Sequence, residues 1–198
     1  MGNQLDLLSL FGAVTGALEE NKTALNKADT YNGDHGDNMV NIFNMVTGAI
    51  SDNKGKDAST QLAAASKLLG GLKSGSAQEY AKGFATAADE FKGGELTADS
   101  VLPLLQSMFG GGAAPETDGS LQGMLSGFLG GDDGKLDASD LLSAGMSFLS
   151  AKNRGKNTQE ALIEALIAQS AFGESPHRTQ SSSIVASTIF DVLGSLNK

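Results

Sequence analysis

The chain contains no cysteine among its 198 residues, so it can form no disulfide bond, zinc–thiolate site or cysteine nucleophile. It also lacks a long apolar run, since nothing approaches the ~18 consecutive apolar residues of a membrane-spanning helix. No basic region precedes the apolar residues near the N-terminus, so we predict no signal peptide and a cytoplasmic location. Basic residues are scarce. The net charge of -9 argues against nucleic acid as a partner, because contact with its phosphates needs basic patches.

Runs of alternating β-branched residues are absent as well, and the apolar residues recur with helical periodicity instead. Met39, Phe43, Val46 and Ile50 fall on one stripe, and the C-terminal segment repeats this pattern. Further helices are predicted at approximately 4–20, 57–69, 76–91, 97–109, 120–129, 138–152 and from 158 onward. We therefore predict an all-α fold in which about eight helices pack antiparallel as a single domain over residues 1–198.

Glycine, with 26 residues, is concentrated between these predicted helices, where it ends helices and forms turns. The segment 110–133 is the most linker-like of these regions. Only one helix-length stretch separates its two glycine clusters, so we interpret it as a loop-rich insertion within one domain and not as a domain boundary.

The stretch TYNGDHGDNMVNIF, residues 30–43, places several oxygen-bearing side chains on a tight turn directly before a predicted helix. The two glycines of the turn permit the chain to double back, which would bring Asp29, Asn32, Asp34 and Asp37 together. Carboxylate and amide oxygens suit Mg²⁺ or Ca²⁺ and not zinc. The spacing does not fit the calcium loop of an EF-hand, because alanine or tyrosine would occupy the first ligand position.

A second interpretation of this turn is purely structural. The side chain of Asp34 or Asp37 would only cap the N-terminus of the following helix, as aspartate often does. The residue types alone favour neither interpretation over the other.

The sequence GDHGDNM, preceded by an aspartate and followed by an amphipathic helix, resembles the signature of the dihydroxyacetone kinase L-subunit family. The resemblance implies a barrel of about eight antiparallel helices that binds ADP or ATP through magnesium ions held by aspartates. The stretch GGLKSGSAQEYAKGF resembles the second glycine motif of that family. GKLDASDLL and SPHRTQSSSIVAS resemble its third and fourth motifs more weakly.

The resemblance, together with the residue types, implies a set of site residues. The predicted Mg²⁺ ligands are Asp29, Asn32, Asp34 and Asp37. The predicted nucleotide-binding residues are His35, Gly36, Asn38, Met39, Ser74, Gly75 and Ser76. In the fourth motif, His177 and Arg178 are predicted to lie in a loop before the last helix.

Several departures from the family pattern affect the expected metal binding. Asn32 stands where the family has its middle aspartate, which leaves one charge fewer for a second ion. Asp29 matches the first aspartate only across a gap, and Asp37 stands where the family has a small or apolar residue. We therefore expect one Mg²⁺ ion, with a second only if Asp37 restores the missing carboxylate.

The resemblance implies a Mg²⁺-dependent phosphotransferase subunit. It would position the nucleotide, without a side-chain nucleophile, for transfer to a small acceptor such as dihydroxyacetone on a partner K-type subunit or another acceptor-binding protein. The alternative is a non-catalytic nucleotide- or metal-binding or assembly module that has lost transfer activity. The asparagine at position 32 favours this alternative.

Overall fold

The structure is a computed structural model that describes residues 6–93, 96–97, 100–109, 158–168 and 170–196. In these ranges the chain forms seven α-helices and one 3₁₀ turn. No β-strand occurs in these ranges, which confirms the predicted all-α fold. The elements are α1 (Leu7–Ala28), α2 (His35–Asp52), α3 (Ala58–Gly70), α4 (Gly75–Glu90), α5 (Val101–Phe109), α8 (Thr158–Ala168), η2 (Ala171–Glu174) and α9 (Pro176–Leu196). The helices predicted at 120–129 and 138–152, and the insertion at 110–133, lie outside the described residues.

Helix α1 is longer than its sequence pattern predicts. The polar stretch from Glu19 to Thr23 suggests an end near residue 20, yet the helix continues to Ala28. Leu18 and Leu25 are both fully buried, so the apolar face of the helix returns to the core after the polar stretch. At its start, the Asp6 carboxylate accepts hydrogen bonds from two backbone N–H groups of the first turn and caps the helix.

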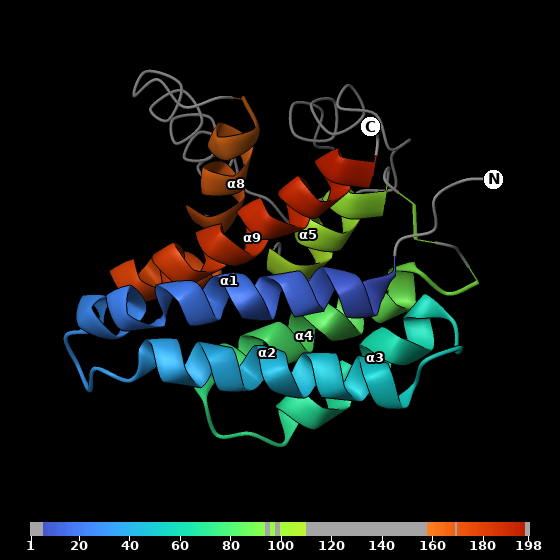
Figure 1. Cartoon of the computed structure of the whole chain (residues 1–198), viewed down its shortest axis with the longest axis horizontal. Coiled ribbons are helices and arrows are strands. Elements are labelled where there is room, and N and C mark those ends of the chain that lie inside the picture. Colours follow the sequence, from blue (N-terminus) through green and yellow to red (C-terminus); the bar gives the residue numbers. More distant parts are fainter. Residues whose placement is uncertain (1–5, 94–95, 98–99, 110–157, 169, 197–198) are drawn as a thin grey trace, which may run out of the picture.

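Six of the described helices, α1 to α5 and α9, form a closed series of contacts around one core. Helix α1 packs between α2 and α9, α3 lies between α2 and α4, and α5 contacts both α4 and α9 (Figure 1). This core is rich in aromatic side chains: the buried Tyr80 ring lies 5.0 Å from Phe43 and 4.6 Å from Phe172, measured between ring centroids. None of the described helices has the length and apolar composition needed to cross a membrane.

The junction between α1 and α2 depends on a glycine and on a cap supplied by the neighbouring helix. A Cβ atom on Gly36 would lie 2.2 Å from the carbonyl oxygen of Lys22, so only glycine permits this approach. Asn26 Oδ1 accepts hydrogen bonds from the backbone N–H groups of Gly36, at 2.7 Å, and Asp37, at 3.2 Å. Asp34 occupies the N-cap position of α2, but its side chain makes no capping hydrogen bond, so the interpretation that the Asp34 side chain caps this helix is wrong.

Three segments meet at one end of the bundle, on the left in Figure 1: the loop 29–34, the start of α4 and the start of α9. Helix α9 begins at Pro176, a position that suits the fixed φ of proline, and the Ser175 carbonyl accepts the Thr179 N–H at 3.0 Å. His177 and Arg178 therefore lie in the first turn of α9. The prediction that they lie in a loop is wrong.

Candidate functional site

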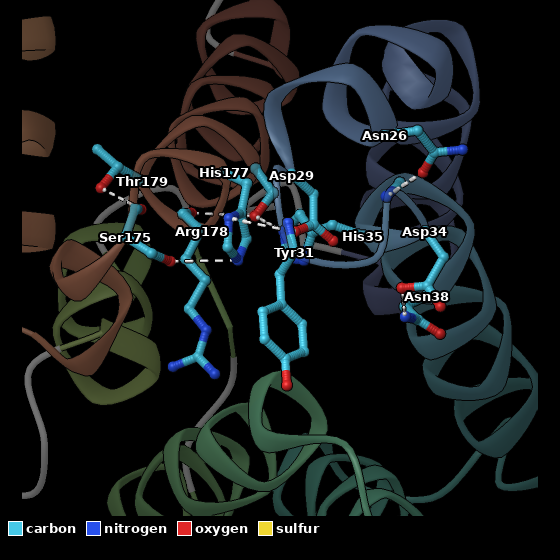
Figure 2. A network of polar contacts seen from close by, with 12 residues as sticks. Asn26, Asp29, Tyr31, Asp34, His35, Asn38, Ser175, His177, Arg178 and Thr179 are labelled. Carbon is cyan, nitrogen blue, oxygen red and sulfur yellow. Dashed lines mark hydrogen bonds and ion pairs between the residues drawn. The ribbon is translucent and has the colours of Figure 1, made fainter.

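The three segments line an open pocket of about 560 Å³. This volume lies within the range of small-molecule binding sites. The lining residues come from the loop, from the first residues of α2 and α4, and from the start of α9: Asp29, Tyr31, Asn32, Asp34, His35, Asn38, Ser74, Gly75, Ser76, Glu174, Ser175, His177 and Arg178. Figure 2 shows how those from the loop and from α9 face one another.

Most of the site residues predicted from the sequence line this pocket. They are Asp29, Asn32, Asp34, His35, Asn38, Ser74, Gly75 and Ser76. Three others lie elsewhere. Met39 is fully buried in the core, and Gly36 packs against α1. The carboxylate of Asp37 accepts a hydrogen bond from Asn26 Nδ2 at 2.7 Å, on the α1 side of the turn.

Asp29 ends α1 and fixes the start of the loop. Its buried carboxylate accepts the Tyr31 backbone N–H at 3.0 Å, and His177 Nδ1 lies 3.8 Å from the same oxygen, Oδ1. The hydrogen bond from Tyr31 holds the pKa of Asp29 below its usual range, and the neighbouring His177 adds to this effect. Asp29 is therefore an ionised carboxylate directed at the first turn of α9.

Asp34 presents an exposed carboxylate on the opposite side of the pocket. Its Oδ1 accepts a hydrogen bond from Asn38 Nδ2 at 2.6 Å, and Asn32 also lines the pocket. Carboxylate and amide oxygens are ligands that Mg²⁺ accepts. Within the described ranges no group of three or more His, Cys, Asp or Glu side chains is arranged to hold a metal ion. These residues fit a Mg²⁺ ion that takes one carboxylate and completes its coordination with ligand oxygens and water.

The two histidines of the chain lie together in the wall of the pocket. The ring of His35 is buried and lies 4.6 Å from the ring of His177, edge to face. His35 Nε2 lies 2.9 Å from Ser181 Oγ, and the Ser181 hydroxyl donates to the Arg178 carbonyl at 3.0 Å. From this network we assign Nε2 of His35 as the donor to Ser181. Burial, reinforced by His177, lowers the pKa of His35 to about 4.

This buried histidine makes the stability of the protein depend on pH. Between the ordinary pKa of 6.5 and the folded value of about 4, the unfolded chain binds a proton that the folded chain excludes. The free energy of unfolding should therefore fall as pH drops through this window, by on the order of 3 kcal/mol in total. Denaturant titrations at several pH values measure this slope. His35→Gln should flatten it, and a variant with an unchanged slope would assign the pH dependence to other groups.

Two helix N-termini and one guanidinium group line one wall of the pocket, where Arg178 Nη1 also lies 3.7 Å from the Glu174 carboxylate. The first N–H groups of any helix lack acceptors within that helix, and Gly75 and Ser76 of α4 hold such positions at the pocket. In α9 the N–H groups of His177 and Arg178 also lack acceptors within the helix, because Thr179 is the first residue whose N–H donates to a preceding carbonyl. The side chain of Arg178 extends toward α4, with Nη2 only 2.9 Å from where a Cβ of Gly75 would lie. Helix N-termini and arginine together favour phosphate or carboxylate groups.

The start of α2, by contrast, offers fewer backbone donors to an anion. Asn26 already accepts the N–H groups of Gly36 and Asp37. Nucleotide binding by the first turn of α2, as the motif implies, would therefore depend mainly on its side chains.

Sequence reasoning missed Asn26, because its capping role depends on how α1 packs against α2. It also did not single out Tyr31, Glu174 or Ser175 as residues that line the pocket. The serine before the Pro-His-Arg sequence was a usable signal: serine followed by proline is a typical helix start, and it would have placed His177 in a helix.

Comparison with protein-family models, curated proteins and solved structures finds no match for this chain. The geometry of the pocket and the motif resemblance are therefore the features of this chain that point to a function.

Proposed function

We propose that this chain binds ADP or ATP with its phosphates in the pocket and Mg²⁺ at Asp34, as a phosphotransferase subunit resembling the dihydroxyacetone kinase L subunit. The observation that carries this proposal is the meeting of opposite charges in one pocket. Arg178 and the N-termini of α4 and α9 line one wall, and the exposed Asp34 carboxylate lines the other.

A polyphosphate suits this arrangement better than a simple carboxylate does. Its oxygens would accept hydrogen bonds from the N–H groups of Gly75 and Ser76 and from Arg178. A phosphate near Asp34 would be repelled by the carboxylate unless a cation lay between them. When bound, Mg²⁺ neutralises phosphate charge and links the phosphates to the protein.

Asp34 is the metal ligand that we favour, and the amide oxygen of Asn32, which lines the same pocket, is the second candidate. Asp29 has another role, because its Oδ1 already accepts the Tyr31 N–H and faces His177. Asp37 is directed at Asn26. The four ligands predicted from the sequence therefore reduce to two, which supports one ion and not two.

The acceptor in this proposal is a small hydroxylated compound such as dihydroxyacetone, held by a partner K-type subunit. The open pocket would let a partner bring its acceptor to the terminal phosphate. This chain would bind and orient the nucleotide and shield its charge, which are the main requirements of phosphoryl transfer.

A second candidate is a non-catalytic module that binds a nucleotide or metal ion, or serves in assembly, without transfer activity. Asn32 in place of an aspartate, and the lack of a larger ligand cluster among the described residues, favour it. Incubation with ATP, dihydroxyacetone and a K-type subunit separates the candidates: formation of phosphorylated acceptor supports the kinase subunit, and binding without product supports the module.

The binding step is tested by thermal denaturation with ADP, ATP or adenosine in Mg²⁺. At a nucleotide concentration 100-fold above Kd, binding contributes about 2.7 kcal/mol, or a rise in Tm of roughly 5–10 °C for a chain of this size. We expect this rise with ADP and ATP but not with adenosine, which lacks phosphates. Arg178→Gln should reduce it. Equal stabilisation by adenosine would show that the phosphates are not what the protein recognises.

A further inference from the structure

Ser175, His177 and Asp29 form a chain of polar contacts in the pocket that nucleotide binding does not require. Ser175 Oγ lies 3.2 Å from His177 Nε2, and His177 Nδ1 lies 3.8 Å from Asp29 Oδ1 (Figure 2). All three residues line the pocket. A hydroxyl next to an imidazole that is oriented by a carboxylate is the arrangement that activates serine as a nucleophile.

We propose that Ser175 is a phosphoryl-accepting nucleophile: its hydroxyl attacks a phosphoanhydride bound in the pocket and becomes phosphoserine, with His177 as the base and Asp29 orienting that base. This inference rests on the proposed nucleotide site for its natural donor. It goes beyond the proposed function, which needs no side-chain nucleophile.

The orientation of the His177 ring supports these roles. The ionised carboxylate of Asp29 lies 3.8 Å from Nδ1 and favours an N–H on that side of the ring, so we assign the Nε2 lone pair to the contact with Ser175. The side chain of His177 is about one-fifth exposed, at 22%, so the base can reach a bound ligand. His35 cannot replace it, because His35 is buried and its Nε2 is bonded to Ser181.

The other serines of the pocket lack such a partner. Ser74 Oγ caps α4 by accepting the Ala77 N–H, at 3.4 Å. Ser76 is buried, with 6% of its surface exposed. Ser175 is therefore the serine of this pocket whose hydroxyl is bonded to a base.

The position of Ser175 also suits the product. The residue directly precedes α9, and a phosphate there would face the helix N-terminus and the nearby guanidinium of Arg178. Both groups stabilise a phosphate that carries two negative charges. They would equally stabilise the charge that spreads over the transferring group.

The step balances without another reactant. The bond from Ser175 Oγ to the terminal phosphorus forms, and the bond from that phosphorus to the bridging oxygen of ATP breaks. ADP leaves with the electron pair, and the hydroxyl proton passes to His177 Nε2. The products are phosphoserine, ADP and a protonated imidazole paired with Asp29.

The test incubates the full chain with ATP and Mg²⁺ and locates phosphorylation by peptide mass spectrometry. We expect phosphate on Ser175, and a rate at least about 100-fold lower in His177→Ala, the usual effect of removing a general base. Ser183→Ala is the matched control, because this serine lies on α9, the helix that Ser175 directly precedes, and its hydroxyl donates to the Thr179 carbonyl. The Ser183→Ala variant should be phosphorylated on Ser175 at the rate of the parent chain. Ser175→Ala should show no phosphate at this position.

Parallel measurements separate failure of this inference from failure of the nucleotide site. If ATP with Mg²⁺ raises Tm but Ser175 stays unmodified, the inference is overturned and the proposed function stands. If ATP does not bind, an organophosphorus fluoridate is used, which needs no nucleotide site. Labelling of Ser175 that depends on His177 would support the nucleophile, and equal labelling of the parent chain and His177→Ala would overturn it.

Discussion

Replacing Gly36 with alanine is expected to destabilise the fold by about 2–4 kcal/mol, through overpacking and loss of a helix cap. The new Cβ would lie 2.2 Å from the Lys22 carbonyl oxygen and 2.8 Å from Asn26 Oδ1. The first of these atoms belongs to the backbone of α1, so α1 and α2 would have to move apart. That movement would also lengthen the two hydrogen bonds by which Asn26 caps α2.

Gly48→Ala is the matched control, because it makes the same change in the same helix. A Cβ atom at position 48 would have no neighbour within 4 Å. Alanine should stabilise an exposed helix position by roughly 0.5–1 kcal/mol. Urea denaturation of both variants measures the difference. If the two variants changed stability equally, the close approach of α1 and α2 at Gly36 would be refuted.

The largest effect on binding is expected at Asp34. Asp34→Ala should weaken Mg²⁺-dependent binding of ADP at least about tenfold, because it removes the carboxylate ligand of the proposed ion. Stability should change little, because the side chain is exposed and its one bond, to Asn38, is also exposed.

Asp37→Ala should have the opposite effects, with a loss of stability and no loss of ADP affinity. Its carboxylate belongs to the same turn but accepts a hydrogen bond from Asn26, outside the pocket. The variant should keep the ADP affinity of the parent chain and lose about 1 kcal/mol of stability, through a weakened Asn26 cap. Loss of binding in Asp37→Ala, with binding retained in Asp34→Ala, would reverse the assignment of the two carboxylates.

The sequence predicts the helices well, because each follows from a local period of apolar residues. It also locates two of the three segments of the pocket, the polar turn around Asp34 and the serine-glycine turn before α4. In each of these turns the polar side chains belong to nearly consecutive residues, so the motif can be recognised without knowledge of the fold.

Contacts between distant segments are the part that the sequence does not reveal. His35 meets Ser181, and Asn26 caps a helix to which it does not belong. Neither residue type nor local spacing indicates such pairs, because they depend on how the helices close around the core. Met39 and Gly36 belong to the motif but do not line the pocket. Met39 packs in the core, and Gly36 permits the close approach of α1 and α2.

Calorimetric titration of ADP into the protein, once in excess Mg²⁺ and once in a chelator, tests most directly whether this pocket binds phosphates through a cation. The charges in the pocket predict binding in Mg²⁺ and an affinity at least about tenfold lower in the chelator, a difference of 1.4 kcal/mol or more. Equal affinity under both conditions would show that Asp34 does not act through a metal ion. Absence of heat under both would contradict the nucleotide site itself.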